Sequence, residues 1–286
     1  MLRLLLSVVL WPIAQFPYVL LKLIGKLFGL LLSWPFRYRK QVIDNNLQKS
    51  FPHLNHAEIT NIRQKYYRHL GYLFVEVLLA NYFPKKLVIK SLGQELNHIQ
   101  KSIKEKTDQY GSIFCIMSHT GNWEILAQSF PLLGVSNGVI VYKKLSNSWF
   151  EYFLNRGRTR FGNELVEMRS TTKHLVRNKS KNQIYFLLND QSPTGNAIIW
   201  KTFLHQKTAF FGTLEKMASK FDRPVFYAYC RRKDFMNFEV KFLELEYKSK
   251  QSLTEQFTQL LQEDIEKQKY NWLWSHKRWK LKYYEQ

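Results

Sequence analysis

The first forty residues constrain this chain most. Residues 4–21 contain no charged side chain, and after Lys22 and Lys26 the apolar pattern resumes until a basic cluster at residues 37–40. A helix needs about 20 apolar residues to cross a bilayer, so the first run is barely long enough. Two prolines and a glutamine inside it weaken a straight spanning helix further. We expect residues 1–36 to form a hydrophobic membrane-anchoring helix that either spans the bilayer or lies on its surface.

A cleaved signal peptide is the alternative interpretation of this segment, because Arg3 precedes the apolar run as a charged start would. However, no clear pair of small residues marks a cleavage site, and the apolar pattern returns beyond Lys26. The basic cluster at 37–40 predicts that the following domain, residues 37–286, lies on the cytoplasmic side of the membrane. Cys115 and Cys230 sit in apolar runs and are expected to be reduced core residues.

The charge balance indicates an acidic partner. The chain carries 43 lysines and arginines against 22 aspartates and glutamates, a formal net charge of +21. Nucleic acid, an anionic membrane surface, and an acidic protein or phosphorylated substrate are the three classes of partner that such a charge fits. Hydrophobic residues make up 45% of the chain, which excludes a disordered protein.

Beyond the N-terminal segment, short apolar runs alternate with helical patterns. Apolar residues at helical spacing predict one long helix, or two, over 55–82. Strands are predicted near 112–117, 138–142, 183–188, 198–203, 224–230 and 238–245, and helices near 123–132, 147–160, 208–221 and 252–269. The alternation is typical of an α/β fold with a central, mostly parallel or mixed sheet covered by helices on both faces. In such sheets functional residues gather beyond the carboxyl ends of the strands.

One loop at such a strand end carries a histidine and a carboxylate. His119 follows the first predicted strand, and Glu124 comes five residues later. A turn through 120–122, with Gly121 supplying a permissive backbone, brings the two side chains together. The carboxylate then fixes the imidazole tautomer and leaves the other ring nitrogen free to accept a proton, as in a general base. In the alternative interpretation, Asn122 caps the next helix, Glu124 complements the helix dipole and His119 is an ordinary loop residue.

The segment His119-Thr-Gly-Asn-Trp-Glu124 is one of several blocks that resemble a known family. It resembles the H-x4-D/E motif of the lysophospholipid acyltransferase superfamily, in the branch of bacterial lipid A late acyltransferases. Glu124 stands where much of the superfamily has Asp. Further blocks similar to that branch follow its order along the chain, at residues 39–47 with 51–52, 155–160, 188–195, 203–212 and 270–280.

The resemblance implies transfer of a fatty acyl chain from an acyl thioester, on acyl carrier protein or coenzyme A, to a hydroxyl of a phosphorylated lipid A precursor at the inner membrane. His119 would be the general base, oriented by Glu124, and no acyl-enzyme is required. Acyl carrier protein is acidic and lipid A precursors carry phosphates, so the charge of +21 agrees with both. Similar proteins acylate aminolipids, lysophospholipids or other lipids, so the acceptor stays open.

Two further blocks supply candidate substrate-binding residues. Arg156, Arg158 and Arg160 alternate at the end of a helical pattern, so they fan out and leave one or two able to bind phosphate, Arg158 foremost. An ordinary basic surface is the alternative interpretation. Asp190 and Gln191 follow another predicted strand, where Asp190 either belongs to the site or caps the next turn.

Two other functions account for part of the sequence. A membrane-tethered nucleic-acid-binding protein would use the charge and the aromatic residues of 270–279, but it needs neither the apolar segment nor the His119 loop, so no nucleic acid is expected. An inactive, scaffold-like relative is disfavoured by the intact His119 and Glu124. No metal or other cofactor is expected, because the histidines and cysteines lack ligand spacing.

Overall fold

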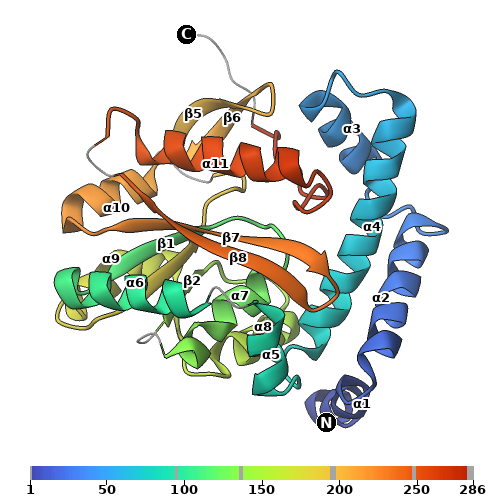
Figure 1. The fold of residues 1–286 in the computed structure, drawn as a ribbon, viewed down its shortest axis with the longest axis horizontal. Helices are drawn as coiled ribbons and strands as arrows, with labels where there is room; N and C mark the ends of the chain where they lie inside the picture. Colours follow the sequence, from blue (N-terminus) through green and yellow to red (C-terminus); the bar gives the residue numbers. More distant parts are fainter. Residues whose placement is uncertain (1, 94–95, 135–137, 194–197, 247–248, 282–286) are drawn as a thin grey trace.

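A six-stranded sheet forms the centre of the protein (Figure 1). The computed structural model describes residues 2–93, 96–134, 138–193, 198–246 and 249–281. The strand order is β3-β2-β4-β1-β7-β8, with parallel pairing throughout except between β7 and β8, which are antiparallel. The strands are β1 (Ile113–Met117), β2 (Gly138–Tyr142), β3 (Glu164–Glu167), β4 (Ile184–Leu188), β7 (Val225–Asp234) and β8 (Asn237–Leu245). The predicted α/β class and mostly parallel sheet are confirmed.

Helices cover both faces of the sheet, as predicted. They are α1 (Leu2–Ala14), α2 (Tyr18–Ser33), α3 (Lys40–Ser50), α4 (His56–Leu79), α5 (Lys85–Ser91), α6 (Leu96–Tyr110), α7 (Trp123–Ser129), α8 (Ser148–Thr159), α9 (Thr171–Arg177), α10 (Thr213–Phe221) and α11 (Leu253–Lys267), with 3-10 turns η1 (Phe130–Leu133) and η2 (Met168–Ser170). The side chains of β1 alternate between two cores, because successive strand residues point to opposite faces. Cys115 and Met117 pack with residues of α5, α6, α7 and α8, whereas Phe114 and Ile116 pack with residues of α10 and α11. Both cysteines are buried and unpaired.

One predicted strand lies outside the sheet. Residues Ile198–Phe203 form β5, which pairs in an antiparallel hairpin with β6 (Gln206–Phe211). The helix predicted over 208–221 includes the last four residues of β6, and this part of the prediction is wrong, because the helix α10 begins at Thr213. Residues 208–211 hydrogen-bond across the hairpin instead, and Thr208, Ala209 and Phe210 are buried there.

Two neighbouring strands send their connections to opposite faces of the sheet. Strand β1 lies beside β4, with Met117 paired to Leu188 at their carboxyl ends. Helix α7 follows β1 into one core, while α10, which follows β4 and the hairpin, packs into the other. Adjacent strands whose connections diverge in this way leave a crevice beyond their carboxyl ends. The fold therefore locates the candidate site before any side chain is considered.

The apolar N-terminus forms two helices instead of the expected single anchoring helix. Pro17 precedes α2 as its N-cap residue, and the chain bends by 117° between α1 and α2. Within the described ranges no single helix is long and apolar enough to cross a bilayer, and α1 and α2 satisfy that criterion only as a bent pair. Large apolar side chains nevertheless remain exposed on them, namely Val8, Val9, Trp11, Val19, Leu20, Leu23, Leu27, Leu30 and Leu31.

Helix α2 packs lengthwise on α4 through three glycines (Figure 1). Gly71 of α4 lies against the backbone of Gly25 and Gly29, and a Cβ atom added at Gly71 would come closer than 3.0 Å to both residues. Real Cβ atoms essentially never approach other atoms so closely, and the atoms in the way belong to backbone that cannot rotate aside. The close approach of the two helices thus depends on the missing side chain.

We predict that Gly71→Ala lowers the free energy of unfolding by about 3 kcal/mol, because the added methyl group forces α2 away from α4. Urea unfolding followed by circular dichroism measures this change. Gly157→Ala in α8 is the matched control, since its added Cβ would lie 3.5 Å from Asn81 Oδ1, an ordinary contact. The control is expected to be neutral or to stabilise by up to about 1 kcal/mol. Equal effects of the two variants would contradict the proposed packing.

Candidate active site

The loops after β1 and β4 bring His119 and Asp190 into contact. Because Met117 and Leu188 are paired at the ends of adjacent parallel strands, the residues two positions further along each chain also face one another. His119 Nδ1 lies 2.6 Å from Asp190 Oδ1. The backbone N–H of His119 also donates to Asp190 Oδ2, at 2.8 Å. Strand register thus creates the contact between residues that are distant in sequence.

Asp190 accepts a further hydrogen bond from the indole of Trp272, 2.7 Å from Nε1 to Oδ2. The carboxylate is buried. Burial alone would raise the pKa of the Asp190 carboxyl, but the charge of His119 and the hydrogen bonds from His119 and Trp272 outweigh it and lower that pKa. An ionised carboxylate only accepts hydrogen bonds, so the proton of the His119–Asp190 bond belongs to Nδ1 of the imidazole.

The second ring nitrogen of His119 meets Gln191. The Gln191 amide Nε2 lies 2.9 Å from His119 Nε2. An amide NH2 only donates, so it presents a hydrogen to the lone pair of the imidazole nitrogen. In its neutral form the imidazole therefore carries its proton at Nδ1 and presents a basic Nε2, which is the protonation state a general base requires.

Glu124 does not hold the imidazole, contrary to the expectation from its spacing. Both of its carboxylate oxygens bind Arg158, with 2.8 Å from Nε to Oε2 and 2.6 Å from Nη2 to Oε1. Glu124 lies in the first turn of α7 and Arg158 in the last turn of α8. Burial would raise the pKa of the Glu124 carboxyl, but the Arg158 guanidinium outweighs it and lowers that pKa. Asp190 takes the orienting position that the sequence analysis gave to Glu124.

The backbone of the loop is fixed by Gly121. Its φ is +58°, and an added Cβ would lie 2.8 Å from Cys230 Sγ on β7. The Gly121 N–H donates to the carbonyl of Asn271, at 3.1 Å. Asn122 caps α7 by accepting from the N–H of Ile125, at 3.0 Å. The glycine belongs to the expected turn and the capping asparagine to the alternative interpretation of the loop, and the structure contains both.

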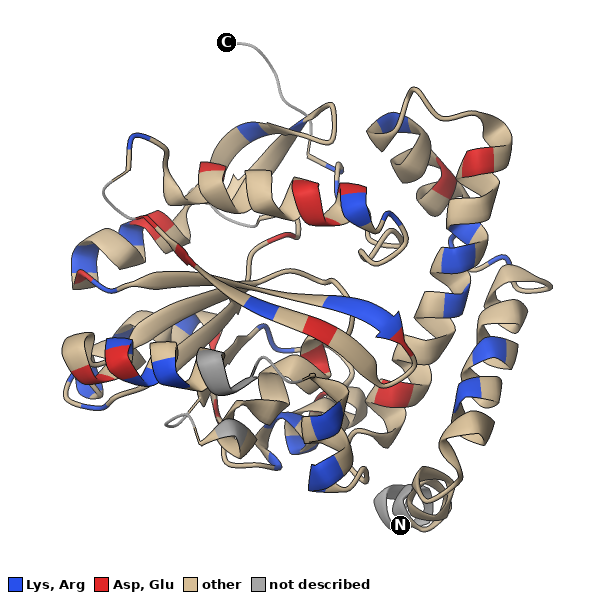
Figure 2. Cartoon of the chain, viewed as in Figure 1, with Lys and Arg blue, Asp and Glu red and all other residues tan. Residues whose placement is uncertain are grey.

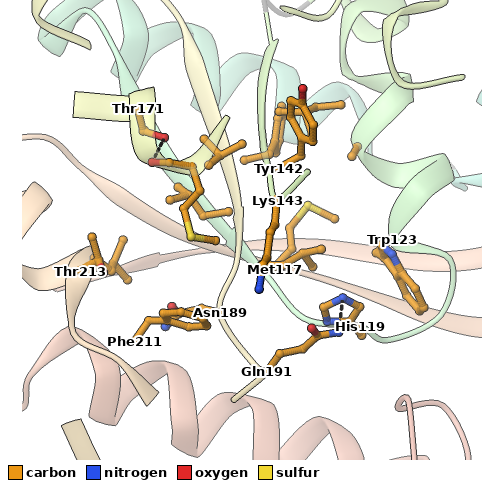
Figure 3. Close-up of a pocket in the computed structure, with 18 of the residues that line it drawn as sticks. Met117, His119, Trp123, Tyr142, Lys143, Thr171, Asn189, Gln191, Phe211 and Thr213 are labelled. Atoms are coloured by element: carbon orange, nitrogen blue, oxygen red, sulfur yellow. Dashed lines mark hydrogen bonds between the residues drawn. The ribbon is translucent and has the colours of Figure 1, made fainter. Parts of the chain in front are cut away.

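His119, Gln191, Glu124 and Arg158 line one cavity of about 340 Å³ (Figure 3). The ring of Trp123 packs edge-on against the imidazole, with 4.8 Å between the ring centres. Figure 3 shows the side chain of Lys143, from the loop after β2, directed into the middle of the cavity. Much of the remaining wall is apolar and comes from β1, β2, β4 and α10, including Met117, Ile140, Phe186, Leu188, Leu214 and Met217.

The two other predicted arginines do not line this cavity. The guanidinium of Arg156 lies over the ring of Tyr82, 5.8 Å from its centre. Arg160 donates to the carbonyl of Ala80, at 2.7 Å. Of the three alternating arginines, the structure therefore brings only Arg158 to the site, because the helix turns its neighbours to other directions.

Sequence reasoning missed two residues of the site. Trp272 belongs to the C-terminal aromatic block, but nothing in its pattern indicates that its indole reaches Asp190. Lys143 directly follows β2, so the rule that places functional residues beyond strand ends could have found it. Lys143 was not identified because no recognisable motif surrounds it in the sequence.

The fold and site define a class of α/β protein with a histidine and a buried carboxylate at the carboxyl edge of a parallel sheet, facing an apolar cavity. The chain matches the family described as bacterial lipid A biosynthesis acyltransferase over residues 1–281, and it belongs to that family. It is also similar to the lipid A biosynthesis lauroyltransferase of Escherichia coli (strain K12), with 21% identity over 210 residues. That match covers 72% of this chain and 66% of the relative, slightly less than two thirds of its length. The family expected from the sequence is confirmed.

We predict that Arg158→Met destabilises the protein by about 2 to 3 kcal/mol, because it leaves the largely buried Glu124 carboxylate without its cationic partner. The side chains of Arg158 and Glu124 are 14% and 13% exposed, so the loss of stability is smaller than for a fully buried ion pair. Urea unfolding measures it. The double variant Arg158→Met/Glu124→Gln should recover most of the loss, and a single variant as stable as the wild type would show that the pair contributes nothing.

Proposed function

We propose that this protein transfers a fatty acyl chain from an acyl thioester to a hydroxyl of a lipid A precursor or a closely related lipid. The observation that carries the proposal is the imidazole of His119, which Asp190 holds with a basic Nε2 beside an apolar cavity. Membership of the lipid A biosynthesis acyltransferase family supports it. The similarity to a lauroyltransferase supports a fatty acyl group as the transferred unit.

In the proposed mechanism, the acceptor hydroxyl displaces the Gln191 amide and binds His119 Nε2. As Nε2 takes the hydroxyl proton, the oxygen attacks the thioester carbonyl and forms the new C–O bond. The tetrahedral intermediate then breaks its C–S bond, and the departing thiolate takes the proton from the imidazolium. Asp190 stays ionised throughout and stabilises the imidazolium through Nδ1–H, so no acyl-enzyme forms.

The apolar part of the cavity is the proposed place for the acyl chain. Met117, Ile140 and Phe186 come from three neighbouring strands, and their side chains line the cavity that His119 borders. An alkyl chain buried against them is removed from water, which is favourable by about 25 cal/mol for each Å². The reacting carbonyl would then lie at the polar end of the cavity, near His119.

The donor and the cellular location follow from charge and from the exposed apolar helices. Acyl carrier protein is acidic, so the net charge of +21 favours it as the donor. Acyl-CoA is the other candidate thioester. The exposed apolar side chains of α1 and α2 favour attachment to a membrane, and the basic cluster at residues 37–40 favours the cytoplasmic face of the inner membrane.

We predict that His119→Ala and Asp190→Asn each lower kcat by about 10²- to 10⁴-fold, the contribution of a positioned general base. The measurement is acyl transfer from labelled acyl carrier protein to a lipid A precursor. Circular dichroism verifies that each variant is folded.

Exposed residues of the same types supply the controls. His56→Ala and Asp108→Asn lie outside the cavity and should leave kcat unchanged within about twofold. Undiminished transfer by His119→Ala would overturn the base assignment, and absence of transfer by the wild type would overturn the proposed reaction.

We propose that Lys143 stabilises the oxyanion of the tetrahedral intermediate. It makes no ion pair within the part of the chain that the structure describes, and Figure 3 shows it directed into the cavity. Removal of one oxyanion donor typically costs about 10²-fold in kcat. Lys143→Met should therefore lower kcat by about 10²-fold with little change in KM.

Lys144→Met is the matched control, because Lys144 is exposed and does not line the cavity. Its kcat should equal that of the wild type. An increase in KM with unchanged kcat in Lys143→Met would instead assign Lys143 to an anionic group of a substrate.

A further inference from the structure

A second cavity, of about 300 Å³, lies away from the candidate active site and shares no lining residue with it. We name it the cationic cavity. Its lining holds six cationic side chains and one acidic one, together with His69, Tyr72 and Tyr270. The charged lining residues are Lys22, Lys26, Lys65, Arg68, Arg232, Lys233 and Asp234. Figure 2 shows the basic segments of α2 and α4 and the basic end of β7 on the same side of the molecule.

Only part of this positive charge is neutralised inside the protein. Arg232 is buried and binds both carboxylate oxygens of Glu76, at 2.5 and 2.7 Å. Lys22 forms an ion pair with Asp234. The side chains of the other four cations form no hydrogen bond or ion pair with any described residue, and all four residues are exposed, namely Lys26, Lys65, Arg68 and Lys233. Like charges collected in a concave site repel one another, and an anion would relieve that repulsion.

His69 adds an unsatisfied donor to the wall of the cavity. The residue is 2% exposed, and Nδ1 accepts a hydrogen bond from Arg232 Nε at 2.9 Å. Burial and the Arg232 charge lower the pKa of His69 well below its usual value, so the ring is neutral and carries its proton at Nε2. Nε2 has no hydrogen-bond partner among the residues described. A buried donor without an acceptor is unfavourable, so this wall of the cavity has an unmet need for a hydrogen-bond acceptor.

Helix α2 joins this cavity to an apolar surface. At about 100° per residue, Lys22 and Lys26 fall between two faces of the helix. One face packs on α4 and contains Leu21, Gly25 and Gly29. The other face is apolar and exposed, and it contains Val19, Leu23, Leu27 and Leu30. The cations therefore stand at the boundary between an anion-binding hollow and a surface suited to hydrocarbon.

We propose that the cationic cavity binds the phosphate headgroup of an anionic membrane phospholipid whose acyl chains lie along the exposed apolar face of α2. A phospholipid joins phosphate and hydrocarbon in one molecule, which is the combination that the cavity and the neighbouring helix face present. An acidic protein would match the charge but would not account for the adjoining apolar face. The proposal stands independently of the acyl transfer reaction.

The test is binding of the full chain to phosphatidylcholine vesicles with and without phosphatidylglycerol, measured by flotation. The variant Lys26→Gln/Arg68→Gln removes two cavity cations from α2 and α4. It is expected to lower the partition coefficient for the anionic vesicles by about 30-fold, since each cation near a charged bilayer contributes about fivefold. Lys65→Gln/Lys233→Gln, which removes the other two unpaired cations, should give the same loss.

The matched control is Lys85→Gln/Lys86→Gln on α5, which changes the net charge equally outside the cavity. Its partition coefficient for the anionic vesicles should fall by no more than about threefold. Equal losses in the control and cavity variants would reveal general attraction by the net charge and overturn the proposal. An equal loss on vesicles without phosphatidylglycerol would do the same, because the cavity would then not recognise the anion.

Two further arms separate the sources of the anion. Inorganic phosphate at matched ionic strength should raise the thermal unfolding midpoint much less than anionic vesicles do. A cavity-dependent rise as large as that with vesicles would identify free phosphate as the ligand and overturn the lipid. Loss of binding to acyl carrier protein by the cavity variants, with vesicle binding intact, would assign the cavity to a protein partner and overturn the proposal as well.

Discussion

The Asp190 carboxylate is the interaction on which the rest of the candidate site depends. It accepts hydrogen bonds from the backbone and the ring of His119 and from the indole of Trp272, so it joins the loops after β1 and β4 to the C-terminal segment. Three charge-assisted hydrogen bonds compensate for the removal of the carboxylate from water. The same bonds set the imidazole tautomer, and the tautomer decides which ring nitrogen faces the cavity.

Much of the fold could be predicted from the sequence because its central strands are buried on both faces. Such strands form continuous apolar runs, as in 113–117 and 184–188, and these were recognised. The β5–β6 hairpin was only half recognised. Residues 206–211 were partly taken for a helix, because their apolar residues run into the amphipathic pattern of α10. Strand β3 has four residues, half of them exposed, and gives no periodic signal that a short window can detect.

The site was predicted to the extent that its residues are close in sequence. His119 and Glu124 share one loop and were paired on that ground, yet each has a partner from a distant segment. The contact between His119 and Asp190 exists because β1 and β4 are neighbours, and strand order is not encoded in a local pattern. The pairing of Glu124 with Arg158 depends equally on how α7 meets α8. Spacing thus located the site, and tertiary packing decided which side chains interact in it.

Asp190 contacts the imidazole of His119, whereas Glu124 is paired with Arg158, and this arrangement shapes the electrostatics of the reaction. Glu124 and Arg158 cancel each other, so the charged group in direct contact with the imidazole is the anion at Asp190. When the ring gains a proton, that anion acquires its counterion across a hydrogen bond that already exists. The new positive charge therefore arises next to a fixed negative one in a poorly solvated place, and no dipole has to turn to receive it.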